Sequence, residues 1–233
     1  MSVLVTGTSR GLGLATARAL VERGHAVIGA QRGASASEPG IVQVLADLGT
    51  ELGIARVVEA CPASSLRGAV FNAGVVLDGA FEAVADPGGE DPIDLHLRLD
   101  LAAPLKLLRA LLRADALAVG ASVVFVGSNL ARHGIAGKVA YAAAKAGIEG
   151  AVRGLARELG PRRMRVNAVA PGLVRTDMTA ALGDEGYAAY AREVPIGRVG
   201  EPADVAGVIM FLLADAASYV SGQVIDVDGG WGC

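Results

Sequence analysis

The chain has 233 residues, of which 52% are hydrophobic and 19% are charged, and its net charge is −3. This composition excludes a disordered chain, which needs low hydrophobicity and high net charge. It also argues against a nucleic-acid groove or a basic membrane surface, and two cysteines are too few for a disulfide framework. The longest apolar stretch, around Val205–Ala214, is about half a membrane span. We therefore expect a soluble, cytoplasmic protein whose residues 1–233 form a single domain.

Short apolar runs alternate along the chain with longer stretches of helical spacing. The short runs predict strands buried on both faces, at Val3–Thr6, Ala26–Ala30, Ile41–Ala46, Gly68–Asn72, Ser122–Gly127, Val166–Ala170 and Gln223–Val227. The longer stretches predict helices over Gly11–Arg23, Thr50–Ala60, Pro92–Leu117, Val139–Leu159 and Pro202–Ala214. This alternation is typical of an α/β fold with a seven-stranded, parallel, doubly wound sheet and helices on both faces.

The connection between the second and third strands is unusually short. It spans Gln31–Gly40 (QRGASASEPG) and is rich in Gly, Ser and Pro. Because a crossover between parallel strands usually needs a dozen or more residues, we expect the second helix to be reduced to a loop.

The first strand continues into a glycine-rich segment, Thr6–Gly13 (TGTSRGLG), and then into a helix. The full G-x-G-x-x-G fingerprint is absent, because Thr16 stands where its last glycine would fall. Glycines nevertheless let a backbone approach a pyrophosphate, and the following helix directs free N–H groups at the anion. The segment predicts dinucleotide binding by Gly7, Ser9, Arg10, Gly11, Leu12 and Gly13, with a tight turn that holds no ligand as the alternative.

The choice of cofactor depends on the residues after the second and third strands. An acid after the second strand would bind a ribose 2′-hydroxyl, but Gln31 and Arg32 stand there instead. With Arg10 in the glycine loop, two guanidinium groups favour NADPH over NADH, although Arg32 could also be a solvated surface cation. After the third strand, Asp47, beside Leu48, is expected either to bind the adenine amino group or to cap a helix.

Tyr141 and Lys145 stand four residues apart, so they share one face of a predicted helix. A free phenol has a pKa of about 10, and a nearby cation lowers it toward the range useful for proton transfer. Ser128 follows a predicted strand at its carboxyl end, where ligands of open α/β sheets bind. These three residues are candidate catalytic groups, although a Y-x-x-x-K spacing also occurs by chance on many helices.

Together these motifs resemble the short-chain dehydrogenase/reductase superfamily over nearly the whole chain, and most of all its 3-oxoacyl-[acyl-carrier-protein] reductases. The resembling segments are the TGxxxGxG-like loop, the Asn72-Ala73-Gly74 motif, the Ser128, Tyr141 and Lys145 set, and Asn167–Thr176. VPIGRVGEPADVAG and SYVSGQVIDVDGGW also read like these reductases. The resemblance implies a Rossmann fold, bound NADP(H) and a homotetramer or homodimer.

The resemblance also implies a ketoreductase mechanism. Tyr141 would protonate a carbonyl oxygen that Ser128 polarises, while Lys145 would hold the nicotinamide ribose and favour the ionised phenol. The remaining implied cofactor contacts are Asn72, Ala73, Gly74, Pro171, Gly172, Val174 and Thr176. Enoyl reductases are disfavoured, because their tyrosine and lysine are more widely spaced. A dehydrogenase oxidising secondary alcohols and a non-catalytic NADP-sensing protein are the alternatives.

The chain departs from this family's pattern at its fourth catalytic position, where Asp100 stands in place of the usual asparagine. A carboxylate there could weaken proton transfer by pairing with Lys145. However, Pro104 lacks the N–H that would bond the backbone carbonyl of Asp100. Our hypothesis is that this carbonyl holds the water of the proton relay, so that the side-chain change is tolerated.

The substrate is less well indicated than the cofactor. The reductases that this chain resembles tend to carry basic residues around the end of the fourth helix, which dock an acidic carrier protein, yet here that region offers mainly Arg109 and Arg113. A carrier-protein partner is therefore doubtful, and a small ketone or β-keto ester is credible. Residues 177–198 are expected to form a substrate lid. The histidines show no metal-ligand spacing, so no metal site is expected; they are His25, His96 and His133.

Overall fold

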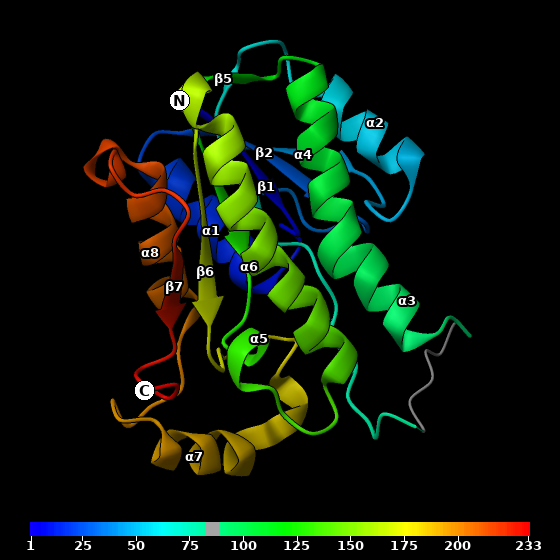
Figure 1. The fold of residues 1–233 in the computed structure, drawn as a ribbon, viewed down its shortest axis with the longest axis vertical. Coiled ribbons are helices and arrows are strands. Elements are labelled where there is room, and N and C mark those ends of the chain that lie inside the picture. Colours follow the sequence, from blue (N-terminus) through cyan, green and yellow to red (C-terminus); the bar gives the residue numbers. More distant parts are fainter. Residues whose placement is uncertain (83–88) are drawn as a thin grey trace.

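The computed structural model describes residues 1–82 and 89–233. All seven strands form one parallel sheet in the order β3-β2-β1-β4-β5-β6-β7 (Figure 1). The strands are β1 Ser2–Thr6, β2 Ala26–Gln31, β3 Ile41–Leu45, β4 Leu66–Phe71, β5 Leu117–Val126, β6 Arg165–Pro171 and β7 Val224–Val227. The order reverses direction between β1 and β4, so the predicted doubly wound sheet is confirmed.

Two apolar cores hold helices against the two faces of this sheet. On one face, Ile54 of α2, Leu107 of α4 and Ile148 of α6 belong to a single cluster. On the other face, Leu20 of α1 and Ile209 of α8 belong to a second cluster. These helices are α1 Gly11–Glu22, α2 Glu51–Glu59, α4 Ala103–Arg113, α6 Val139–Leu159 and α8 Pro202–Leu213. Helices therefore cover both faces, as the alternating pattern predicts.

The connection from β2 to β3 contains no helix, which confirms the expected loop. An ion pair across 2.7 Å between Arg18 of α1 and Glu38 ties this loop to the neighbouring helix. The short crossover leaves the end of β2 open toward the carboxyl edge of the sheet, where a ligand can approach.

The prediction of one helix over Pro92–Leu117 is wrong. The segment forms α3 Pro92–His96, a π-helical turn at Leu97–Ala102, and α4, which ends at Arg113. Asp115 then has a φ of 49°, in the left-handed region that breaks a helix, and Leu117 already pairs with Leu66 as part of β5. The segment up to Leu117 is predicted to be helical because Leu117 continues the apolar spacing. Leu117 is buried, however, as a residue of the sheet and not of a helix.

The loops and short helices after the strands gather at one end of the molecule. Figure 1 shows α7, Gly183–Glu193, lying beyond the tips of β6 and β7, with α5, Leu130–His133, beside it. Because ligands of open α/β sheets bind outside the carboxyl ends of the strands, we expect the functional site at this edge. Among the described residues, no helix is long and apolar enough to cross a membrane.

Candidate active site

A cavity of about 1330 Å³ opens at the carboxyl edge of the sheet. Every candidate residue named from the sequence lines it except Gly13. The lining candidates are Gly7, Ser9, Arg10, Gly11, Leu12, Gln31, Arg32, Asp47, Leu48, Asn72, Ala73, Gly74, Asp100, Ser128, Tyr141, Lys145, Pro171, Gly172, Val174 and Thr176. Residues as far apart in sequence as Gly7 and Thr176 thus line the same cavity.

The glycine loop after β1 is held in a shape that side chains would obstruct. Gly7 has a φ of +76° and Gly11 a φ of +56°, both in the left-handed region. Gly13 is buried behind the loop, where an added Cβ would overlap the Gly7 carbonyl oxygen. Gly13 therefore brings α1 close to the loop, and the free N–H groups of the helix start near the cavity.

Thr6 and Asn72 join the ends of β1 and β4 beneath this loop. The Thr6 hydroxyl oxygen accepts hydrogen bonds from the backbone N–H groups of Asn72 and Ala73, at 2.9 and 3.0 Å. In return, Asn72 Nδ2 donates to the Thr6 carbonyl oxygen at 3.0 Å. The sequence analysis did not identify this role of Thr6. A hydroxyl residue at the end of a buried strand is the sequence feature that could have indicated it.

At the end of β2, the Gln31 side chain is occupied by neighbours. Its Oε1 accepts from the Thr8 hydroxyl at 3.0 Å, and its Nε2 donates to Ser35 at 2.9 Å. By contrast, Arg10 and Arg32 are exposed, and neither makes an ion pair with a carboxylate of the described chain. Two unpaired guanidinium groups at the rim favour an anionic ligand.

Asp47 does not cap the following helix. Thr50 caps α2, since its hydroxyl oxygen accepts from the Gly53 N–H at 3.0 Å. Asp47 Oδ1 instead accepts from the Gly49 N–H at 2.9 Å and fixes the turn after β3. The capping alternative for Asp47 is therefore wrong, and its side chain stays at the cavity wall.

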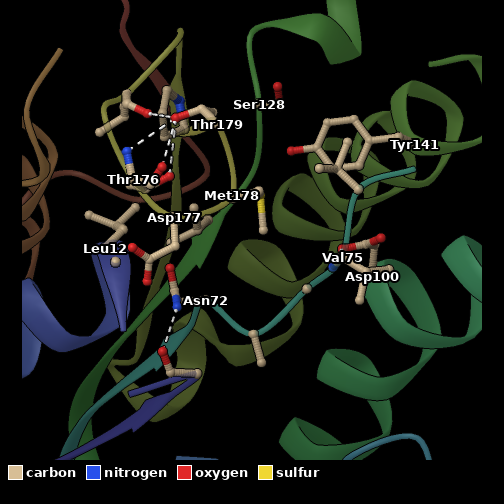
Figure 2. A pocket seen from close by; sticks show the side chains of 18 of the residues that line it. Leu12, Asn72, Val75, Asp100, Ser128, Tyr141, Thr176, Asp177, Met178 and Thr179 are labelled. Atoms are coloured by element: carbon tan, nitrogen blue, oxygen red, sulfur yellow. Dashed lines mark hydrogen bonds between the residues drawn. The ribbon is translucent and has the colours of Figure 1, made fainter. Parts of the chain in front are cut away.

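Ser128, Tyr141 and Lys145 come together from two elements. Ser128 follows β5, is buried, and accepts the Leu130 N–H at 3.2 Å. Lys145 is buried on α6, where its ammonium donates to the Val126 carbonyl oxygen at 3.0 Å and lies 5.6 Å from the Tyr141 ring centroid. Figure 2 shows the Tyr141 hydroxyl directed into the space beside Ser128 and Met178. A phenol, an aliphatic hydroxyl and an ammonium group thus border one pocket.

Comparisons with known proteins agree on one family. Residues 7–232 match the family model described as "Enoyl-(Acyl carrier protein) reductase". The chain is 36% identical to the 3-oxoacyl-[acyl-carrier-protein] reductase FabG of Vibrio harveyi, over 97% of this chain and 95% of the relative. It is 37% identical to the 3-oxoacyl-[acyl-carrier-protein] reductase MabA of Mycobacterium bovis, over 99% of this chain and 92% of the relative. A short-chain dehydrogenase family protein from Francisella tularensis has a similar structure, with a TM-score of 0.88, 30% identity, and coverage of 99% and 98%.

This chain belongs to the short-chain dehydrogenase/reductase family. The resemblance inferred from the motifs is confirmed. Proteins of this family are oxidoreductases that use a nicotinamide cofactor, and this chain is accordingly an oxidoreductase on a Rossmann fold.

Asp100 is where this short-chain dehydrogenase/reductase departs from its family. The side chain is buried in the π-helical turn, and its Oδ2 lies 2.7 Å from His96 Nδ1. Its Oδ1 accepts from the Val75 N–H at 3.2 Å and lies 3.6 Å from the Lys145 ammonium. The expected pairing between the Asp100 carboxylate and the Lys145 ammonium is present, but at ion-pair distance and not as a close hydrogen bond. Pro104 lies just beyond this turn, where the helix changes from π to α geometry.

The wall opposite Tyr141 is built by the segment after β6. Thr179 organises it: its hydroxyl donates to the Val174 carbonyl at 2.7 Å, accepts from the Thr176 N–H at 3.1 Å, and lies 3.0 Å from the Tyr187 hydroxyl. Figure 2 shows Thr176 and Thr179 side by side in this wall. Sequence reasoning missed this residue, although a threonine three residues after Thr176 is a local turn signal.

Aromatic side chains close the outer end of this wall. Tyr190 accepts from the Leu173 N–H at 3.1 Å and stacks on Trp231, with ring centroids 5.9 Å apart. Burial raises the pKa of the Tyr190 phenol, so it stays neutral and holds the backbone. The sequence analysis also did not identify Trp231 as a cavity residue. It lies among the last residues of this sequence and reaches the cavity only through the fold.

The histidines do not gather as metal ligands in the chain outside 83–88. No group of three or more His, Cys, Asp or Glu side chains there could hold a metal ion. His133 packs edge-to-face on Trp231 at 5.5 Å, and His96 bonds Asp100. These two histidines therefore make packing and hydrogen-bond contacts within the chain.

Proposed function

We propose that the protein is an NADPH-dependent ketoreductase that reduces the ketone of a 3-oxoacyl thioester or of a related β-keto ester or ketone. The observation that supports this most is the meeting of Ser128, Tyr141 and Lys145 in one cavity with the glycine loop. The Tyr141–Lys145 spacing of four residues argues against enoyl reduction, although the matching family model is described as an enoyl reductase. The FabG and MabA relatives are 3-oxoacyl-[acyl-carrier-protein] reductases, which supports ketone reduction.

The residues present fit a dinucleotide. Left-handed glycines in the loop leave the space that side chains would take from a pyrophosphate, and α1 begins directly behind them. Arg10 and Arg32 at the rim would hold the 2′-phosphate that distinguishes NADPH. Asp47 would accept from the adenine amino group, and Asn72–Gly74 and Pro171–Thr176 would line the nicotinamide side.

NADPH supplies a hydride to the carbonyl carbon when it is bound. Ser128 would donate a hydrogen bond to the carbonyl oxygen and polarise it, and Tyr141 would give that oxygen its proton. Lys145, anchored to the Val126 carbonyl, would hold the nicotinamide ribose and stabilise the negative charge left on Tyr141. The backbone carbonyl of Asp100 beside Pro104 would hold a relay water, so Asp100→Asn should raise turnover at neutral pH by less than about tenfold.

The substrate side of the cavity is largely apolar. Ile135, Met178 and Leu182 line it while remaining about half exposed, so they face the space that a substrate would fill. The segment 177–198 would act as the lid over it. Carrier-protein docking is not favoured: in the first turn of α4, Lys106 pairs with Glu51 at 3.0 Å, which leaves Arg109 and Arg113 as the exposed cations toward the end of this helix.

The deciding experiment follows NADPH and NADH consumption with a panel of carbonyls and, in the reverse direction, NADP⁺ reduction with the corresponding secondary alcohols. Acetoacetyl-CoA, ethyl acetoacetate and simple aliphatic and aryl ketones cover the proposed substrates. Turnover with NADPH on the thioester or the β-keto ester is expected. Turnover only of secondary alcohols with NADP⁺ would favour the oxidative dehydrogenase, and tight NADPH binding without any turnover would favour the sensor.

A further inference from the structure

A buried histidine lies behind the Tyr141–Lys145 pair, at a position to which the mechanism above gives no part. The His96 side chain is 1% exposed and that of Asp100 is fully buried, and the two are bonded across 2.7 Å. The His96 ring also packs edge-to-face on the Tyr141 ring, with centroids 5.7 Å apart. His96 therefore contacts both the unusual carboxylate and the proposed proton donor.

The Asp100 carboxylate is held in one orientation. His96 bonds Oδ2, while Oδ1 accepts the Val75 N–H at 3.2 Å. Figure 2 shows Asp100 beside Val75. An added Cβ at Gly74 would overlap Oδ1, so this oxygen packs directly against backbone. An ionised carboxylate only accepts hydrogen bonds, so we assign the tautomer in which His96 Nδ1 carries the proton and donates to Oδ2. Two further ionisable side chains lie on the Oδ1 side: Lys145, whose ammonium is 3.6 Å from Oδ1, and Tyr141, whose ring centroid is 5.6 Å from that ammonium.

Removing the histidine would change what Asp100 does to Lys145. A buried carboxylate that loses a donor seeks another, because an unsatisfied buried charge is costly. The nearest strong donor is the Lys145 ammonium, which now bonds the Val126 carbonyl. A shortened Asp100–Lys145 contact would draw the ammonium away from the ribose and from Tyr141.

We propose that His96 is a positioning residue that adapts the active site to Asp100. By bonding Oδ2, it keeps the carboxylate at ion-pair distance from Lys145 and leaves the ammonium to serve the cofactor and Tyr141. This inference rests on the proposed function. It explains how a carboxylate is accommodated at a position where the family usually has a neutral amide.

The test is a set of substitutions at His96 in two backgrounds. His96→Leu removes the donor, whereas His96→Asn keeps an amide N–H near the place of Nδ1. In the wild-type background, His96→Leu should lower kcat/KM for acetoacetyl-CoA about 30-fold and raise the Kd for NADPH at least about fivefold. It should also move the pH profile of kcat. His96→Asn should recover most of each loss.

The second background is Asp100→Asn, in which no carboxylate is left to restrain. There His96→Leu should cost less than about fivefold in kcat/KM. Leu95→Ala is the matched control, since it removes a buried apolar side chain from the same helix. Its effects should appear mainly in the melting temperature and be the same in both backgrounds.

Three results would overturn the positioning role: a loss below threefold in His96→Leu, an equal loss in both backgrounds, or no recovery with His96→Asn. If His96→Leu does not fold, the comparison of His96→Asn with the His96→Leu/Asp100→Asn double variant decides. A crystal structure of unliganded His96→Leu should show the Lys145–Asp100 distance shortened from 3.6 Å. Failure of the wild-type protein to bind NADPH would instead contradict the proposed function, and this distance would still test His96.

Discussion

Replacing Gly13 by alanine is the sharpest test of the glycine loop. The added Cβ would overlap the Gly7 carbonyl oxygen and lie 2.8 Å from the Gly7 carbonyl carbon. Carbon atoms in contact prefer about 3.5–4.0 Å, so the loop and α1 must separate by roughly 1 Å. Both partners are backbone, and a clash of this kind costs about 2–3 kcal/mol. For a chain of this length that corresponds to a melting temperature roughly 5–10 °C lower.

The same displacement should weaken NADPH binding more than tenfold, because the loop and the start of α1 form the proposed pyrophosphate cradle. Thermal unfolding and NADPH fluorescence titration measure the two effects. Gly150→Ala is the control: Gly150 is exposed on α6, with no atom near the added Cβ, and should gain about 0.5–1 kcal/mol. A Gly13→Ala protein with unchanged melting temperature and NADPH affinity would refute the close packing of α1 on the loop.

Three further predictions concern the proton donor, the cofactor phosphate and acid stability. Tyr141→Phe should reduce turnover by more than about a thousandfold while NADPH still binds in a fluorescence titration; retained turnover would remove Tyr141 from the mechanism. Arg10→Ala and Arg32→Ala should each raise the KM for NADPH about tenfold and leave that for NADH within about twofold, and equal effects on both cofactors would argue against 2′-phosphate contacts. The pKa of Asp204 is lowered from 3.8 to about 2, first by its hydrogen bond from Arg198 and then by the Glu201 N–H. Its stabilising effect is therefore present above about pH 4 and lost as the pH falls toward 2, so Asp204→Asn should flatten the acid limb of an unfolding curve, and an unchanged limb would contradict this.

The parts of the fold that follow local rules were predictable from the sequence. The inner strands are buried on both faces, as at Val3–Val5, and a short Gly- and Pro-rich connection cannot hold a helix. At the edge strand β3 the prediction of burial on both faces is wrong, because no strand of the described chain covers its outer side and Val42 is exposed. The end of α4 was not predictable in this way. Leu117 fits the helical spacing, and only its pairing with Leu66, 51 positions earlier (117 − 66 = 51), assigns it to β5.

The same distinction between local and long-range signals holds for the candidate site. The glycine loop and the Tyr141–Lys145 pair could be found from the sequence, because the residues of each motif lie within a few positions of one another. Thr6 and Trp231 were missed, since their contributions depend on residues far along the chain: Thr6 supports Asn72, and Trp231 stacks on Tyr190. Long-range contacts of this kind leave no periodic signal in the sequence.

The environment of Asp100 shows why a departure from a family pattern has to be judged with its neighbours. Taken alone, a carboxylate in place of an amide adds a buried negative charge 3.6 Å from Lys145, which argues for a weakened enzyme. One helical turn earlier, His96 supplies the donor that the carboxylate needs, at i, i+4 spacing on the same face. The two positions therefore act as a unit, because Asp100→Asn alone would leave His96 facing a neutral amide oxygen, a weaker acceptor than a carboxylate. For this reason the effect of either substitution is informative only when it is measured against the other.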